Sequence, residues 1–153
     1  MFDLSDEQLI GPRLQIVNPL LWEIGHLAWF QEFWVLRHLG GQPPILKQGD
    51  KLYDSASVAH DTRWDLPLLE RDETLAYMQR VLERVIDHAG DKSGRLRDEE
   101  GYDQKYFLNL VLFHEQMHDE AITYTRQTLS TPIESRSAMI PEGMCSVAAF
   151  RFS

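Results

Sequence analysis

Hydrophobic residues recur with helical spacing over residues 102–129. A helix of this length turns one apolar stripe towards the protein interior. The stripe consists of Phe107, Leu110, Val111, Ala121 and Ile122. His114 and His118 lie on the same stripe, one helical turn apart, so both imidazoles are expected to point inwards. Two inward histidines at this spacing are a candidate pair of metal ligands.

A second periodic segment covers residues 18–39. It begins with Asn-Pro, where asparagine is a favoured N-cap and proline suits the first helical position, and Gly-Gly follows its end. Its apolar positions are separated by four, three, four and three residues: Trp22, His26, Trp29, Phe33 and Leu36. His26 therefore lies in the middle of an inward stripe, and it is the third histidine on an apolar face.

A third helix is predicted from Asp72, as its N-cap, to Ala89, with Gly90 as its end. Its inward positions are expected to be Leu75, Met78, Leu82, Val85 and Ile86. Residues 4–9 predict a short helix that Gly-Pro would end. Residues 41–71 show little periodicity, but their aromatic and aliphatic side chains favour an ordered loop packed against the domain.

Three long amphipathic helices with inward histidines predict an all-α helical bundle, in which metal sites are formed by side chains on facing helices. A closed four-helix core would need a further partner. The first seventeen residues, the long loop and a second chain are the three candidates. Residues 132–153 show no clear helical period, and residues 146–152 are compatible with a short strand.

Composition restricts the class of protein. The 153 residues are 43% hydrophobic and 25% charged, which is typical of one soluble globular domain. The formal net charge of −9 argues against nucleic-acid binding, because phosphates are bound by clustered lysine and arginine. No apolar run is long enough to predict a membrane span. The acidic N-terminus does not resemble a signal peptide, and the single cysteine, Cys145, has no internal partner, so a cytoplasmic location is expected.

Neutral imidazole nitrogens suit Zn²⁺ and Fe²⁺, and a third ligand from another helix would leave open positions for substrate or dioxygen. His26 is the best candidate because it alone among the remaining histidines lies in an apolar stripe. His38 and His88 lie near helix ends, where a cation is favourable without any metal. His60 belongs to the loop, and no pattern places it at the site.

Two other interpretations remain open on the residues alone. A histidine on an apolar stripe is often a hydrogen-bonded core residue. The segment His114-Glu-Gln-Met-His118 also matches H-E-x-x-H, which would make Glu115 the general base of a zinc peptidase. Glu120 points to the other side of the helix from His118, so its options are a hydrogen bond outside the coordination sphere or plain solvation.

Three segments together resemble a known family. They are Asn18-Pro-Leu-Leu-Trp-Glu-Ile-Gly-His26-Leu-Ala-Trp-Phe-Gln-Glu32, Tyr53-Asp-Ser and His114-x-x-x-His118-x-Glu120. They are similar to the DinB-like domain of ergothioneine sulfoxide synthases and their selenoneine-forming relatives. The resemblance implies a four-helix bundle in which His26, His114 and His118 hold a non-haem iron(II). It also implies a thiol substrate, dioxygen, and an oxidative carbon–sulfur bond to the imidazole of trimethylhistidine.

The resemblance implies a division into a metal-binding domain, residues 1–131, and a tail, residues 132–153. The tail segment Met139-Ile-Pro-Glu-Gly143 looks similar to the start of the family's formylglycine-generating-enzyme-like domain, which carries its catalytic tyrosine. The family's first helix has no counterpart here, so we expect a domain shortened at both ends. Arg63 is matched to the arginines that bind the thiol substrate's carboxylates.

Two further functions stay open. One is a zinc- or nickel-dependent thiol transferase, in which the metal lowers the pKa of a small thiol. The other is a non-catalytic fragment whose exposed bundle face needs a partner chain or a second copy. The sequence leaves undecided whether sulfur or selenium is the donor and whether the chain acts alone.

Overall fold

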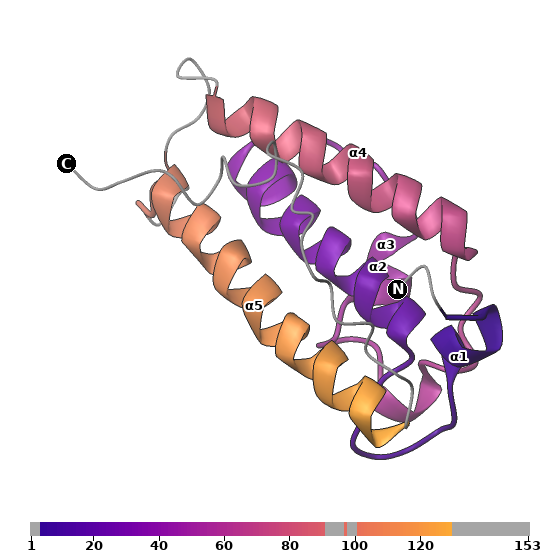
Figure 1. Ribbon diagram of the computed structural model, residues 1–153. Coiled ribbons are helices and arrows are strands. Elements are labelled where there is room, and N and C mark those ends of the chain that lie inside the picture. Colours follow the sequence, from indigo (N-terminus) through magenta and orange to yellow (C-terminus); the bar gives the residue numbers. More distant parts are fainter. Residues whose placement is uncertain (1–3, 91–96, 98–100, 130–153) are drawn as a thin grey trace.

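The computed structural model describes residues 4–90, 97 and 101–129 (Figure 1). Throughout these ranges the regular elements are helices, and no strand occurs among them. The prediction of an all-α fold is confirmed. The predicted tail, residues 132–153, and Cys145 lie outside the described residues.

Three long helical segments form the body of the molecule. The elements are α1 (Asp6–Ile10), α2 (Leu20–Gln31), the π-helix η1 (Glu32–Leu39), α3 (Gly49–Tyr53), the 3₁₀-helix η2 (His60–Thr62), α4 (Arg71–Gly90) and α5 (Gln104–Thr128). The α2–η1 segment lies between α4 and α5, and α1 packs against α2 (Figure 1). Because α2 has neighbours on several sides, every residue from Leu20 to Trp29 is buried.

Local capping explains where the outer helices begin and end. Ser5 and Gln8 form a reciprocal capping box that starts α1, and Gly11 ends this helix with a φ of 62°. The Asp103 side chain accepts the backbone N–H of Tyr106 at 2.9 Å and starts α5. The predicted short N-terminal helix and the predicted histidine helix are therefore both present.

The first long helix differs from its prediction in two ways. Pro19, not Asn18, occupies the N-cap position of α2, and the Asn18 side chain donates to Glu23. The helix also changes to π-helical geometry from Glu32 to Leu39, where the Gly40 N–H reaches the Val35 carbonyl at 3.0 Å. The wider turn keeps the apolar positions of η1 buried: Val35, Leu36 and Leu39.

The inward face of α4 was predicted only in part, since Val85 is buried as expected and Leu75 and Leu82 are partly buried. Its buried residues are Thr74, Tyr77, Val81 and Val85, whereas Met78 and Ile86 are 37% and 50% exposed. Hydrogen bonds explain why the buried face of α4 differs from the predicted one. The Tyr77 hydroxyl donates to Glu32 at 2.6 Å, and the Thr74 hydroxyl donates to the Leu69 carbonyl at 3.2 Å. Hydrophobic periodicity assigns such polar residues to the exposed side of a helix, so it does not predict a buried face that contains them.

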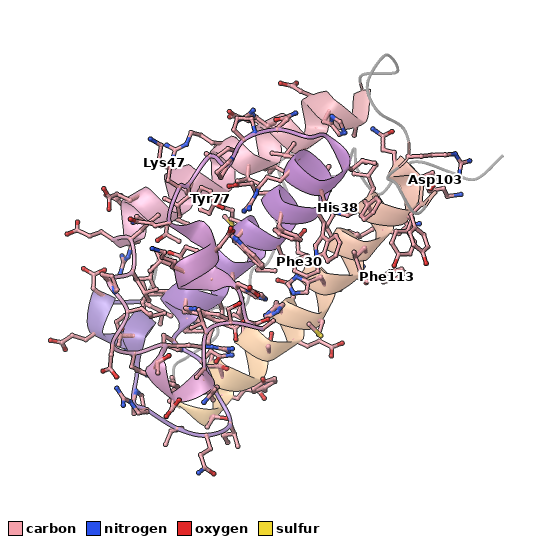
Figure 2. All side chains as sticks on the ribbon, turned by 180° about the vertical axis from the view of Figure 1, so that it is seen from behind. Phe30, His38, Lys47, Tyr77, Asp103 and Phe113 are labelled. Atoms are coloured by element: carbon pink, nitrogen blue, oxygen red, sulfur yellow. The ribbon has the colours of Figure 1, made fainter. Side chains whose placement is uncertain are left out.

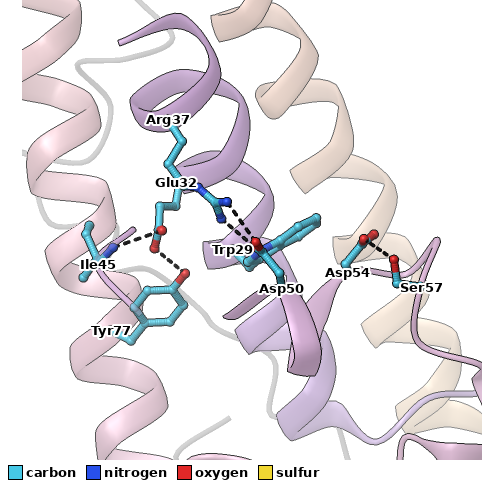
Figure 3. Close-up of polar contacts among 8 residues, drawn as sticks. All are labelled: Trp29, Glu32, Arg37, Ile45, Asp50, Asp54, Ser57 and Tyr77. Carbon is cyan, nitrogen blue, oxygen red and sulfur yellow. Dashed lines mark hydrogen bonds and ion pairs between the residues drawn. The ribbon is translucent and has the colours of Figure 1, made fainter. Parts of the chain in front are cut away.

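The loop after η1 is ordered, as predicted, and polar contacts hold it to the helices (Figure 3). Asp50 accepts hydrogen bonds from Trp29 Nε1 at 2.7 Å and from both terminal nitrogens of Arg37 at 2.5 and 2.9 Å. Glu32 accepts the Ile45 N–H at 3.1 Å as well as the Tyr77 hydroxyl. The Asp50 contacts fix α3 against the α2–η1 segment, and α3 ends at Tyr53 beside the histidines.

Two observations relate to the expectations of an exposed bundle face and of no membrane span. Large apolar side chains are exposed along α5, among them Phe113 at 66% and Met117 at 55%. None of the helices in the described part of the chain is long and apolar enough to cross a membrane.

Candidate metal centre

Three histidines from two helices meet in the interior. His26 comes from the middle of α2, and His114 and His118 come from successive turns of α5. One ring nitrogen of each lies within 4.8 Å of the other two. His26 and His118 are 2% and 9% exposed, while His114 is half-buried. The structure thus brings together the three residues that the sequence predicted as ligands.

The separation of two of these nitrogens fits a shared ion. His26 Nε2 and His114 Nε2 are 3.2 Å apart. Two nitrogens at about 2.1 Å from one ion are separated by about 3.0 Å at an octahedral angle and about 3.4 Å at a tetrahedral one. The observed separation lies between these values. Three nitrogens on one side of an ion would leave its remaining positions open.

A backbone carbonyl sets the orientation of His26. Its Nδ1 lies 2.7 Å from the carbonyl oxygen of Tyr53, the last residue of α3. A carbonyl oxygen only accepts, so Nδ1 carries the proton and Nε2 keeps its lone pair. A ligand histidine commonly donates its other ring N–H in this way. The end of α3 thus selects the tautomer that a metal requires.

A carboxylate sets the orientation of His118. Its Nδ1 donates to Glu23 Oε2, and Glu23 is only 1% exposed. Burial alone would raise the pKa of Glu23, but the hydrogen bond and charge interaction with His118 outweigh it and lower this pKa. Glu23 is therefore an ionised acceptor for the Nδ1–H group, and in the neutral ring of His118 the lone pair that could bind an ion lies on Nε2.

Aromatic rings pack against the imidazoles. The Trp22 ring stacks on His26 with a centroid distance of 4.8 Å, and Phe30 stacks on His114 at 3.6 Å. Figure 2 shows Phe30 between α2 and α5, whereas Phe113 lies on the outer side of α5. These rings restrict the imidazole planes and exclude water from two sides of the cluster.

Burial of the imidazoles makes folding depend on pH in the metal-free protein. Desolvation lowers the pKa of His26 to about 4 and that of His114 to about 3. The unfolded chain therefore binds more protons than the folded one below about pH 6.5. We expect these imidazoles to leave the free energy of unfolding undiminished above that pH. The free energy of unfolding should then fall as the pH approaches 4, by up to about 3 kcal/mol for His26.

Urea unfolding in the presence of a chelator, from pH 7.5 to 5, would measure this dependence above the range in which carboxylates titrate. The variant His26→Gln should show a shallower slope. Equal slopes for the two proteins would contradict the assignment.

The other predicted site residues lie elsewhere. Glu120 is exposed on α5, and the carboxylate against His118 is Glu23, which the sequence reasoning missed. Arg63 is 8% exposed, and its guanidinium donates to Asn18 Oδ1 at 2.7 Å. His60 bonds the Val17 carbonyl at 2.8 Å and is not part of the cluster.

The peptidase interpretation has little support in this arrangement. Glu115 is exposed and accepts a hydrogen bond from Gln31 at 3.2 Å. The H-E-x-x-H match needs no catalytic base to explain it, because His26 completes a cluster with both of its histidines.

Comparison with known proteins identifies relatives. Hercynine oxygenase of Mycolicibacterium smegmatis is 27% identical over 124 residues, which are 80% of this chain and 27% of the relative. The enzyme of the same name from Mycobacterium tuberculosis is 27% identical over 80% of this chain and 28% of its own length. That of Mycolicibacterium thermoresistibile is 27% identical over 97% of this chain and 32% of its own length. This chain therefore spans about a third or less of these relatives. The DinB superfamily model matches residues 2–122, and the chain belongs to the DinB superfamily.

Proposed function

We propose that this chain is the metal-binding domain of a non-haem iron(II)-dependent sulfoxide synthase, which forms a C–S or C–Se bond on trimethylhistidine in ergothioneine-type biosynthesis. The observation that carries the proposal is the cluster of His26, His114 and His118, whose ring nitrogens lie within 4.8 Å of one another. The similarity to three hercynine oxygenases over 80% or more of this chain supports the reaction class.

The residues of the chain divide the work of holding an ion. His26, His114 and His118 would bind it through ring nitrogens. The Tyr53 carbonyl sets the tautomer of His26, and the Glu23 carboxylate sets that of His118. When bound, iron(II) would supply open positions for a thiolate and dioxygen. The catalytic acid or base is not assigned to any residue of this chain.

Metal binding is the first test. Anaerobic titration of the chelator-treated protein with Fe²⁺ should give about one ion per chain, with the imidazole ligands visible in the spectrum of the Co²⁺-substituted protein. Failure to bind Fe²⁺, Co²⁺ or Zn²⁺ would contradict the proposal.

Substrate chemistry is the second test. Addition of a small thiol to the Co²⁺ protein should produce a thiolate-to-metal absorption band, because an open position remains. Oxygen uptake by the Fe²⁺ protein with thiol and trimethylhistidine would support the synthase. Thiol transfer without oxygen uptake, with Zn²⁺ or Ni²⁺ as the preferred ion, would instead favour a DinB-like thiol transferase.

A further inference from the structure

A line of buried polar side chains leads away from His118. Glu23 Oε2 accepts the His118 Nδ1 proton, and Glu23 Oε1 accepts a hydrogen bond from Asn18 Nδ2 at 2.6 Å. Asn18 Oδ1 in turn accepts from Arg63 Nη1 at 2.7 Å. The line joins α5, α2, the segment before α2 and the loop between α3 and α4. Each oxygen and nitrogen in it has the polarity that its neighbour requires.

The charges along this line are complementary. Glu23 is 1% exposed and negatively charged, and Arg63, 8% exposed, supplies a positive charge one side chain away. A buried carboxylate with hydrogen bonds on both oxygens and a nearby guanidinium avoids most of the penalty for burial. Arg63 is itself fixed by the Val58 carbonyl at 3.3 Å and by the Trp22 ring, whose centroid lies 3.8 Å from its Cζ.

Trp22 connects the same arginine to a second ligand. Its ring is stacked with His26, with 9° between the two planes. Arg63 therefore reaches His118 through Asn18 and Glu23, and it reaches His26 through Trp22. Displacement of the loop that carries Arg63 would loosen two of the three imidazoles.

We propose that Glu23, Asn18 and Arg63 are positioning residues that aim His118 Nε2 at the metal and couple metal binding to the order of the loop over residues 54–69. This inference rests on the proposed metal site. It gives Arg63 a role different from direct binding of a substrate carboxylate. The coupling is reciprocal, so the metal should stabilise the loop as much as the loop stabilises the metal.

The central test compares Glu23→Gln with Glu32→Gln by Zn²⁺ titration against a chromophoric chelator. Glu32 is a matched control, because it is also buried, lies in the same helical segment and accepts two hydrogen bonds, but does not contact the histidines. Glu23→Gln should weaken Zn²⁺ binding about 10- to 100-fold, the range typical for mutation of a residue hydrogen-bonded to a metal ligand. Glu32→Gln should stay within about threefold of the parent, although both variants lose stability.

Arg63→Lys and Arg63→Met separate the two roles of the arginine. Weaker Zn²⁺ binding in the absence of any thiol, with Lys retaining more affinity than Met, supports positioning. Unchanged Zn²⁺ affinity with loss of thiol binding alone would overturn the inference and assign Arg63 to the substrate.

Two measurements do not depend on how well the variants fold. Imidazole ¹⁵N shifts of the metal-free parent should show His118 protonated at Nδ1. Hydrogen exchange within residues 54–69 should slow when Zn²⁺ binds. A parent protein that binds no metal refutes the proposed function, whereas a parent that binds Zn²⁺ while Glu23→Gln binds it equally well refutes only this inference.

Discussion

Replacing His118 by alanine is expected to weaken metal binding strongly and also to destabilise the metal-free fold. Loss of one of three ligands should weaken Zn²⁺ or Fe²⁺ binding by more than about 100-fold. Even mutation of a residue that is only hydrogen-bonded to a ligand lowers metal affinity by about 10- to 100-fold. The variant would also leave the Glu23 carboxylate buried without its imidazole partner. An unpaired buried charge of this kind costs about 3 kcal/mol of unfolding free energy.

His114→Ala provides the informative contrast. It should weaken metal binding to the same extent, but His114 is half-buried and its closest ring–ring contact is with Phe30, at a centroid distance of 3.6 Å. The stability lost without metal should be about 1 kcal/mol, the value of one aromatic contact. Metal titration and urea unfolding with chelator would separate the two effects. Equal stability of the two variants would contradict the structural role assigned to Glu23.

His88→Ala serves as the control for both variants. His88 lies in the last turn of α4 and is not part of the histidine cluster. It should keep the parent's metal affinity, and saturating metal should still raise its melting temperature. At one hundred times the dissociation constant, that stabilisation amounts to about 2.7 kcal/mol.

The ligands could be predicted from the sequence because each lies on an apolar helical stripe. The i, i+4 spacing of His114 and His118 and the inward position of His26 are local properties of two helices. The burial of Glu23 could have been predicted by the same reasoning. An acidic residue one turn before His26, within a run of otherwise apolar residues, is unusual, and it marks a carboxylate that is buried for a reason.

The contacts beyond Glu23 could not be predicted in this way. Asn18 was interpreted as a helix cap and Arg63 as a substrate ligand, because both patterns are local or family-based. In the structure their side chains bond each other across 45 positions of sequence, and His118 meets Glu23 across 95. Periodicity carries no information on pairings between different elements.

The same limit explains the errors in the fold. The helices were predicted because capping residues and apolar periods are local. The buried face of α4 was predicted only in part because Thr74 and Tyr77 point inwards, Tyr77 to Glu32 on another helical segment and Thr74 to the Leu69 carbonyl just before α4. The π-helical geometry of η1 was missed because a continuous helical period does not distinguish a wider turn from an α-helical one.

Gly25→Ala is the second substitution with a large expected effect, although it lies next to a ligand and changes none. A Cβ at this position would lie 2.3 Å from Cε1 and Cζ of the Tyr53 ring. Tyr53 is fully buried, so its ring cannot move aside at little cost. Alanine gains about 1 kcal/mol of helix propensity over glycine. Overpacking of this severity outweighs that gain, with a cost of about 3 kcal/mol.

The metal site should be affected through the backbone of Tyr53. Its carbonyl accepts the Nδ1 proton of His26 at 2.7 Å, so a displaced Tyr53 withdraws the group that selects the tautomer of that ligand. We therefore expect Gly25→Ala to weaken Zn²⁺ binding about tenfold or more, in addition to lowering stability. Chelator competition and urea unfolding measure the two effects separately.

Gly90→Ala is the matched control, because a Cβ there would meet no atom within 4 Å at the end of α4. It should leave both quantities close to those of the parent. Adding Tyr53→Leu to Gly25→Ala should restore part of the lost stability, because the shorter side chain makes room for the new methyl group. It should not restore full metal affinity unless the carbonyl of residue 53 also returns to His26. Parent-like stability and affinity in Gly25→Ala would show that the close packing of α3 on α2 does not set the position of His26.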